Sequence, residues 1–225
     1  PQQFFDINEN FFSSWSPKMA YVLGLIVTDG CISKTGTVSL SMNDKELLEK
    51  VRKVMGSTHK IEPSKHQKNL YIFHFARENM VKDLESFGIM PKKSLNVKFP
   101  DVPHEYLPHF IRGVFDGDGS VMLKKASKYC PLIVKFYSGS KGFIETMEGK
   151  LQELGMPKRI IYSQENRKNP FYNIVYGHRD SKELFKVLYK KTENGLFLER
   201  KYKRFLEGLR EADHGKGTGE VVSIT

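Results

Sequence analysis

A chain of 225 residues with 39% hydrophobic and 28% charged side chains is long enough for one large domain or two small ones, and its composition excludes an intrinsically disordered protein. The formal net charge of +10 favours a polyanionic partner. Residues 1–100 hold 14 Lys and Arg against 10 Asp and Glu, and the remainder holds 22 against 16, so the excess is not confined to a basic tail.

Cysteine usage and hydropathy indicate the compartment. Cys31 and Cys130 form no CxxC pattern, which argues against a zinc ribbon or a disulfide framework and fits a reducing interior. No apolar run reaches membrane-spanning length, and no signal-type segment begins the chain. We therefore expect a soluble intracellular protein, in the cytoplasm, the nucleoid or an organelle matrix, without a membrane partner.

The first elements follow from caps and periodicity. Residues 1–15 are aromatic and aperiodic, which predicts an arm packed on the body. Ser16 as N-cap, Pro17 as first helical residue and Gly30 as stop predict an apolar helix. The remaining expectations for this half, residues 1–90, are a strand over 37–42, a helix over 43–56, a strand pair over 58–76 and a helix over 77–88. Residues 91–103, with three prolines, predict a linker.

The same order then repeats in a second half, residues 104–210. The pattern predicts a helix over 104–117, two strands within 120–139, a helix over 140–155, a strand pair over 158–177 and a helix over 178–191. Aligning the two halves places Tyr71 on Tyr172 and Phe73 on Ile174. A repeat of this length predicts two similar halves that bury their apolar helices against each other. The glycine-rich residues 211–225 are expected to form a flexible tail.

Basic residues concentrate in the predicted strands and turns, whereas acids concentrate in the helices. No acid occurs between Asp118 and Glu145. Solvated lysines that protect sheet edges are one explanation. Because tyrosines are interleaved with them, at Tyr71, Tyr137, Tyr162 and Tyr172, we favour sheets that face nucleic acid. The candidate DNA-binding residues are Lys34, Lys60, Lys65, Lys68, Lys124, Lys125, Lys128, Lys135, Arg159, Arg167 and Lys168.

Two apolar helices end in an acid followed by a glycine, at Asp29 and Asp118. An acid at this end opposes the helix dipole and costs roughly 0.3–1 kcal/mol, and the glycine is expected to close the helix in the left-handed conformation. Small residues four apart predict that the two helices pack closely, which would bring both carboxylates together; the predicted interface residues are Ala20, Gly24, Gly113 and Gly117. Adjacent carboxylates repel each other unless a cation lies between them, and hard oxygen ligands suit Mg²⁺.

The stretches "VLGLIVTDG" (22–30) and "IRGVFDGDG" (111–119) resemble the two signature motifs of the single-chain LAGLIDADG homing endonucleases. The resemblance covers most of residues 16–210. It implies an α+β fold, a pseudo-twofold pair of αββαββα halves in which each antiparallel sheet faces the DNA major groove. It also implies catalytic and metal-binding roles for Asp29 and Asp118, with backbone near Val27, Thr28 and Gly117. Lys93 and Lys201 match the positions of the family's catalytic lysines.

The implied function is a monomeric endonuclease that breaks double-stranded DNA at a long asymmetric site, cutting one phosphodiester per strand to leave 3′ overhangs. The resemblance implies Mg²⁺ or Mn²⁺ as cofactor, with Ca²⁺ binding without efficient cleavage. The motifs differ at position two (Leu23 and Arg112) and at position six (Val27 and Asp116), which implies an asymmetric interface.

Two non-cleaving alternatives stay open: an RNA maturase acting on intron RNA, which could coexist with cleavage, and a DNA-binding regulator. The retained acid pair favours the enzyme, because basic residues at these positions would bind phosphate better. An intron, an intein and a free-standing gene are all compatible origins.

Overall fold

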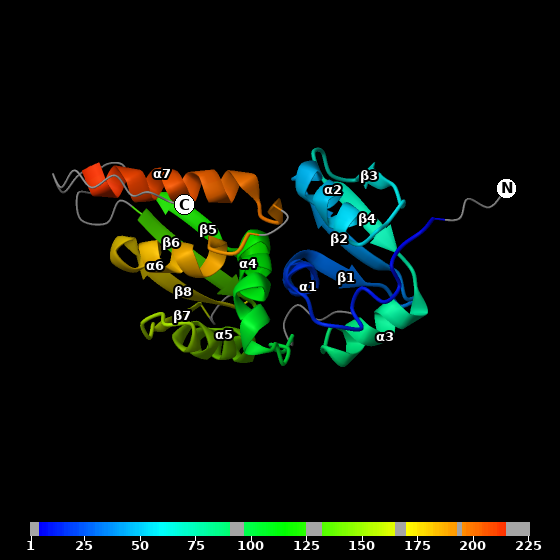
Figure 1. Cartoon of the computed structure of the whole chain (residues 1–225), viewed down its shortest axis with the longest axis horizontal. Helices are drawn as coiled ribbons and strands as arrows, with labels where there is room; N and C mark the ends of the chain where they lie inside the picture. Colours follow the sequence, from blue (N-terminus) through cyan, green and yellow to red (C-terminus); the bar gives the residue numbers. More distant parts are fainter. Residues whose placement is uncertain (1–4, 91–96, 125–131, 165–169, 193–194, 215–225) are drawn as a thin grey trace.

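The computed structural model describes residues 5–90, 97–124, 132–164, 170–192 and 195–214. Two halves lie side by side, and their apolar helices α1 (Pro17–Asp29) and α4 (Leu107–Asp118) pack against each other between them (Figure 1). Each half combines an antiparallel sheet with helices, which confirms the predicted α+β fold. None of the described helices is both long and apolar enough to cross a bilayer.

The first half has the αββαββα order that the resemblance implies, with a short strand before the one expected over residues 37–42. After α1 the chain forms β1 (Gly30–Ile32), β2 (Val38–Met42), α2 (Lys45–Val54), β3 (Ile61–Pro63), β4 (Tyr71–Phe75) and α3 (Glu78–Ser86). The strands make one antiparallel sheet in the order β1-β2-β4-β3.

The second half repeats this order. A short 3₁₀ helix, η2 (His104–Tyr106), leads into α4, and the chain continues as β5 (Ser120–Leu123), β6 (Leu132–Ser138), α5 (Lys141–Glu153), β7 (Ile161–Gln164), β8 (Phe171–Gly177), α6 (His178–Tyr189) and α7 (Glu199–His214). The sheet order is β5-β6-β8-β7. β8 therefore occupies the position of β4, as the alignment of Tyr71 with Tyr172 predicts.

Alternation along the strands separates a core face from an open face in each sheet. In β6, Leu132, Val134 and Phe136 are buried, whereas Lys135 and Tyr137 alternate with them on the open face. Tyr162 also lies on the open face, opposite Asn173. Tyr71 and Tyr172 have the core parity and pack against the hydrophobic core. Only two of the four tyrosines therefore fit the prediction that they face nucleic acid.

The caps of the two central helices were predicted in part. Ser16 Oγ accepts a hydrogen bond from Met19 N at 3.1 Å, so α1 begins as expected. The expectation of left-handed glycines at the other end is wrong, because Gly30 has φ −87° and Gly119 has φ −79°. The chain turns directly into β1 or β5, and a Cβ at either glycine would collide with the last turn of the helix. Both positions therefore require glycine because a side chain there has no room beside the helix end.

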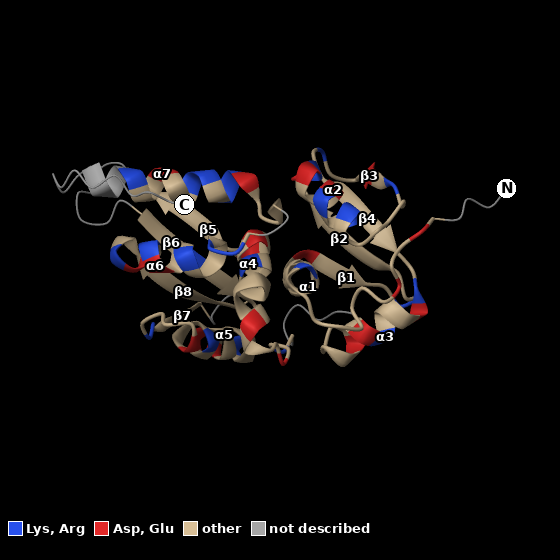
Figure 2. Cartoon of the chain, viewed as in Figure 1, with Lys and Arg blue, Asp and Glu red and all other residues tan. Residues whose placement is uncertain are grey.

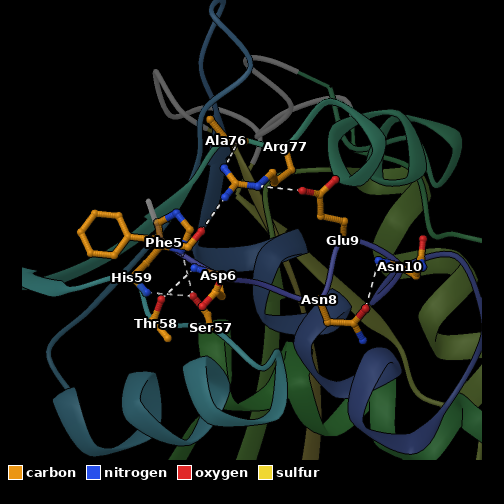
Figure 3. A network of polar contacts seen from close by, with 10 residues as sticks. All are labelled: Phe5, Asp6, Asn8, Glu9, Asn10, Ser57, Thr58, His59, Ala76 and Arg77. Carbon is orange, nitrogen blue, oxygen red and sulfur yellow. Dashed lines mark hydrogen bonds and ion pairs between the residues drawn. The ribbon is translucent and has the colours of Figure 1, made fainter. Parts of the chain in front are cut away.

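The arm and the inter-half segment both pack on the body. Thr58 Oγ1 accepts from Asp6 N at 2.7 Å, and the Arg77 guanidinium donates to Phe5 O at 2.6 Å and pairs with Glu9 at 2.9 Å (Figure 3). Residues 97–103 of the predicted linker form no helix or strand, and Val97 and Val102 are buried against the core.

α7 is an addition to the repeat. It packs Phe205 against Phe115, with ring centroids 6.2 Å apart, and against Phe185 at 5.2 Å. The helix reaches His214, four residues into the segment expected to be a tail. Its first turn meets the junction between the halves, where the predicted site lies.

Candidate active site

The close contact between α1 and α4 depends on two glycines. A Cβ at Gly24 would collide with the carbonyl oxygen of Phe110, and a Cβ at Gly113 would collide with that of Tyr21. The two backbones therefore touch at this crossing. Ala20 is fully buried on α1.

This packing places the two motif acids at adjoining helix ends, where the charges of both act on Lys201. Asp29 is half-buried at the end of α1, and Asp118 is exposed at the end of α4. Asp29 Oδ2 lies 3.0 Å from the position that a Cβ would take at Gly117, one residue before Asp118. A side chain at residue 117 would also collide with Thr28, so the small residue there lets the helix ends approach.

A cavity of about 210 Å³ opens at this junction. It is lined by Asp29, Ser41, Met42, Asn43, Asp44, Leu70, Asp116, Gly117, Leu198 and Arg200. The lining combines residues of α1 and of the region around β2 in the first half with residues of α4 and the start of α7 in the second. Arg200 and Asp44 form an ion pair across it, with Nε 3.0 Å from Oδ2.

Lys201, expected to be catalytic, is buried with 6% exposure. Its Nζ donates to the carbonyl oxygens of Phe115 at 2.7 Å, Asp116 at 2.8 Å and Gly117 at 3.0 Å. These are carbonyls at the negative end of α4, where a cation is favourable. Burial lowers the pKa of Lys201 to about 8, while the charges of Asp116, Asp29 and Asp118 act in the opposite direction. The structure thus places the ammonium on the backbone that carries Asp118.

Asp116, the acid at position six of the second motif, joins three elements. It is 2% exposed, and its Oδ2 accepts hydrogen bonds from Tyr21 Oη on α1 and from Leu198 N, both at 2.8 Å. Burial raises the pKa of this carboxyl to about 6. Its Oδ1 has no hydrogen-bond partner among the described residues. The carboxylate fixes α4 to α1 and to the segment before α7.

Arg112, at position two of the same motif, is also buried, with 1% exposure. Its guanidinium donates to Leu196 O at 3.0 Å and to Leu188 O at 2.9 Å, and it lies 3.2 Å from His109 Nδ1. Burial, together with the Arg112 charge, lowers the pKa of His109 to about 4. Sequence comparison of the two motifs found Arg112 and Asp116 as departures, but their partners Tyr21, Leu188, Leu196 and Leu198 lie 76 to 95 residues away and could not be read from the pattern.

The candidate DNA-binding residues are distributed mainly at the ends of strands. Lys34, Lys60, Lys65, Lys68 and Lys124 are exposed in turns or next to strand ends. Lys135 is half-buried on the open face of the second sheet. Lys93, Lys125, Lys128, Arg167 and Lys168 lie outside the described residues.

Arg159 is held inside the protein surface. Its guanidinium pairs with Asp180 and lies 5.4 Å from the ring centroid of Tyr176, and its backbone N donates to Glu148 at 2.7 Å. Because its guanidinium already has these partners, the structure argues against the predicted role of Arg159 as a DNA contact.

The donor set is compatible with a hard cation. The carboxylate of Asp29 and the hydroxyl and amide oxygens of Ser41 and Asn43 line the cavity, and Asp118 follows Gly117, which also lines it; oxygen donors of this kind suit Mg²⁺ or Mn²⁺. Within the described part of the chain, no three His, Cys, Asp or Glu side chains converge as a metal site.

Comparison with known proteins identifies the family. A model of the LAGLIDADG-like domain matches residues 16–88 and 105–189, one match in each half. The chain belongs to the LAGLIDADG family. The matched segments include both motif helices and both sheets.

Individual relatives are distant. The chain is 26% identical over 198 residues to a probable translation initiation factor IF-2 of Methanocaldococcus jannaschii, which covers 81% of this chain. The chain spans only part of the curated relatives that it matches, 16% of this factor and 60% of another protein from the same archaeon.

Solved structures show the same fold. A mesophilic variant of the homing endonuclease I-DmoI superposes with a TM-score of 0.53 at 16% identity, covering 82% of this chain and 98% of that one. The LAGLIDADG meganuclease I-AabMI, bound to uncleaved DNA, superposes with a TM-score of 0.58 at 15% identity, covering 90% and 92%. Our protein therefore has the fold of the single-chain LAGLIDADG homing endonucleases.

Proposed function

We propose that the protein is a divalent-metal-dependent homing endonuclease that makes a double-strand break in DNA at a long asymmetric site. The observation that supports the proposal is the position of Asp29 and Asp118 at the adjoining ends of two helices whose backbones touch. Structures of I-DmoI include complexes with DNA and Mn and with target DNA and Mg, which supports the same partner and cofactor class here. The net charge of +10 fits a DNA substrate.

The roles of the residues follow from their positions. We assign to Asp29 and Asp118 the binding of Mg²⁺ or Mn²⁺ together with phosphate oxygens of the DNA. A bound divalent ion lowers the pKa of water and polarises a phosphoryl oxygen, which is the chemistry that phosphodiester hydrolysis requires. Lys201 and Asp116 keep the end of α4 in place, and therefore keep Asp118 beside Asp29. Lys93 stays a candidate for stabilising negative charge on the leaving oxygen.

The two halves are equivalent in fold but unequal in detail. Only the second motif carries Arg112 and Asp116, and α7 belongs only to the second half. Because the two sheets also present different side chains, we propose that the target has two different half-sites, read by one monomer. One cut per strand with 3′ overhangs is part of the same proposal.

The segment match within a much longer translation factor supports an origin as a mobile coding element. We propose that cleavage opens a recipient gene for insertion of that element. The acid pair favours cleavage over a purely binding role, because two carboxylates repel phosphate unless a cation neutralises them.

A selection for cleaved molecules from a randomised duplex library tests this proposal. With Mg²⁺ or Mn²⁺ we expect one family of sequences to be cut on both strands, with 3′ overhangs. With Ca²⁺ we expect binding without efficient cleavage. The control is the Asp29→Asn/Asp118→Asn protein, which should bind DNA and leave the library intact.

Two outcomes would contradict the proposal. Tight, sequence-specific DNA binding without cleavage in either metal would identify a regulator. Preferential binding of structured intron RNA, again without DNA cleavage, would identify a maturase.

A further inference from the structure

One face of α7 is exposed and rich in cations. The helix buries Phe205 and Leu209 against the second half, whereas Arg200, Lys203 and Arg204 are exposed. Residues three and four apart share one face of a helix, so these three side chains form a single stripe. Figure 2 shows the basic positions along α7. We call Arg200, Lys203 and Arg204 the α7 stripe.

The stripe begins at the candidate active site. Arg200 lines the cavity that contains Asp29 and also lines a second, shallow groove of about 530 Å³. This groove is formed by Leu123, Arg200, Lys203, Arg204 and Glu207. It contains three cations and one carboxylate. A surface of predominantly positive charge therefore leads directly away from Asp29.

We propose that the α7 stripe binds the phosphate backbone of DNA beside the phosphodiester that Asp29 serves. The proposal rests on the endonuclease function and extends the DNA-binding surface beyond the two sheets. Arg200 and Arg204 are about 6 Å apart along the helix axis, and their long side chains give them the reach to meet successive phosphates of one DNA strand. Two arginines at this spacing can each contact a phosphate of the same strand.

The present partners of the stripe do not prevent this role. The Arg200 side chain is 62% exposed and its partner Asp44 26%, and Lys203, which pairs with Glu199 at 3.3 Å, is 71% exposed. Exposed ion pairs contribute little to stability, so phosphate can replace the carboxylate at small cost. DNA binding would then separate Arg200 from Asp44 in the cavity next to Asp29.

The salt dependence of binding tests the stripe. We would measure binding of a random-sequence DNA duplex in Ca²⁺ at several salt concentrations for the parent and for the Arg200→Gln/Lys203→Gln/Arg204→Gln protein. The log–log slope should become shallower by about one unit for each side chain that touches a phosphate. The matched control, Lys82→Gln/Lys182→Gln/Lys186→Gln, removes the same charge from surface positions of α3 and α6 and should keep the parental slope.

A second variant predicts a gain. Asp44→Asn removes the carboxylate that now pairs with Arg200, and it should tighten binding of the same duplex by about 1.5- to 5-fold, the worth of one exposed ion pair. In an Arg200→Gln background, Asp44→Asn should tighten DNA binding less, because the arginine that it would free for phosphate is absent.

The outcomes separate the two levels of the argument. If the parent binds and cuts DNA but the stripe variant has the parental salt slope, the proposed DNA-binding role of the α7 stripe is wrong, whereas the proposed endonuclease function is unaffected. An equal loss of slope in the stripe and control variants would also overturn the stripe, since it would show a general charge effect. If the parent neither binds the duplex nor cuts the library, the endonuclease proposal fails and the stripe fails with it.

Discussion

Buried charges at the end of α4 determine where an exposed acid can lie. Lys201 binds three consecutive carbonyl oxygens immediately before Asp118, and Asp116 receives hydrogen bonds from Tyr21 and Leu198. The Lys201 ammonium neutralises the negative end of α4. The Tyr21 hydroxyl and the Leu198 amide satisfy the hydrogen-bonding capacity of the buried Asp116 carboxylate. Their removal should affect stability at least as much as chemistry.

Substituting Lys201 tests this structural role. Lys201→Met leaves the carbonyls of Phe115, Asp116 and Gly117 without their donor in a buried place, and should lower the free energy of unfolding by about 2 kcal/mol. Chemical denaturation measures the change. Lys203→Met, on the exposed side of α7, is the control and should change stability by less than about 0.5 kcal/mol. Equal stability of the two variants would mean that Lys201 does not hold α4.

His109 gives the protein a measurable pH dependence. Its pKa in the folded state is about 4, lowered from 6.5 by burial and by Arg112. On acidification, His109 therefore takes up its proton in the unfolded chain before it does so in the folded protein. Above pH 6.5 the ring is neutral in both states, so protonation of His109 costs the folded protein no stability there. As pH falls from 6.5 to 4, the free energy of unfolding should lose about 3 kcal/mol from this group.

The measurement is a set of denaturation curves across that pH window for the parent and for His109→Gln. The variant has no titrating group at this position, so its stability should fall less steeply. Parallel pH profiles for the two proteins would show that His109 is not buried as a neutral ring.

At the level of elements, the contact between α1 and α4 is the least tolerant part of the fold. Gly24→Ala and Gly113→Ala each place a methyl group against a backbone carbonyl of the partner helix, which cannot move without separating the halves. We expect each to lower the free energy of unfolding by about 1–3 kcal/mol or more. Thermal or chemical denaturation measures this loss.

α5 offers a matched control for these substitutions. Gly142 and Gly149 are helical, and a Cβ at either would meet open space. Replacement by alanine there should raise stability by about 0.5–1 kcal/mol. If all four alanine variants behaved alike, the backbones of α1 and α4 would not be in contact.

Sequence periodicity predicted elements well where their amphipathic pattern was regular. Ser16 with Pro17 located the start of α1, and the alignment of Phe73 with Ile174 located equivalent strands of the two sheets. α7 was not predicted, because it lies outside the repeat. The prediction of a left-handed Gly30 was wrong because β1 begins at Gly30 itself, without a loop between helix and strand. The local sequence does not reveal this direct connection.

Site residues were predictable to the extent that the motif contains them. Asp29 and Asp118 follow from their position in the motifs, and the structure places them at the adjoining ends of α1 and α4. Lys201 was predicted to lie beside the site. That its ammonium binds the carbonyl oxygens at the end of α4 depends on the packing of α7 against the second half, which no local pattern reveals. Arg159 was predicted to bind DNA, and in the fold it is paired with Asp180, a partner 21 residues away that the sequence pattern does not reveal.

At the scale of the whole molecule, cations surround the open faces of the sheets more than they cover them. In the first sheet the open face carries Ser39, Ser41 and Ile72 together with the acid Glu62, while the lysines lie in the turns. This distribution suits a protein in which turn lysines contact the DNA backbone and strand residues contact bases, since phosphate contacts position a protein and base contacts specify its site.

The turn lysines of the first half can be tested together. Lys34→Ala/Lys65→Ala/Lys68→Ala should make the log–log salt slope of DNA binding shallower by about one unit for each phosphate that these lysines neutralise in the parent. Sequence preference in the cleavage selection should change little. An unchanged slope would place the first half's binding surface for the DNA backbone elsewhere.

The most direct test of the central claim compares strand cleavage by two single variants at the selected target site. Asp29→Asn and Asp118→Asn remove one charge each from the junction of α1 and α4 without changing side-chain size. Each should bind the site like the parent in Ca²⁺, and each should lose double-strand cleavage in Mg²⁺ by at least about 100-fold, because loss of a metal ligand should cost more than the roughly 10–100-fold typical of an outer-shell partner. Full double-strand cleavage by either variant would contradict a single active centre built from both acids.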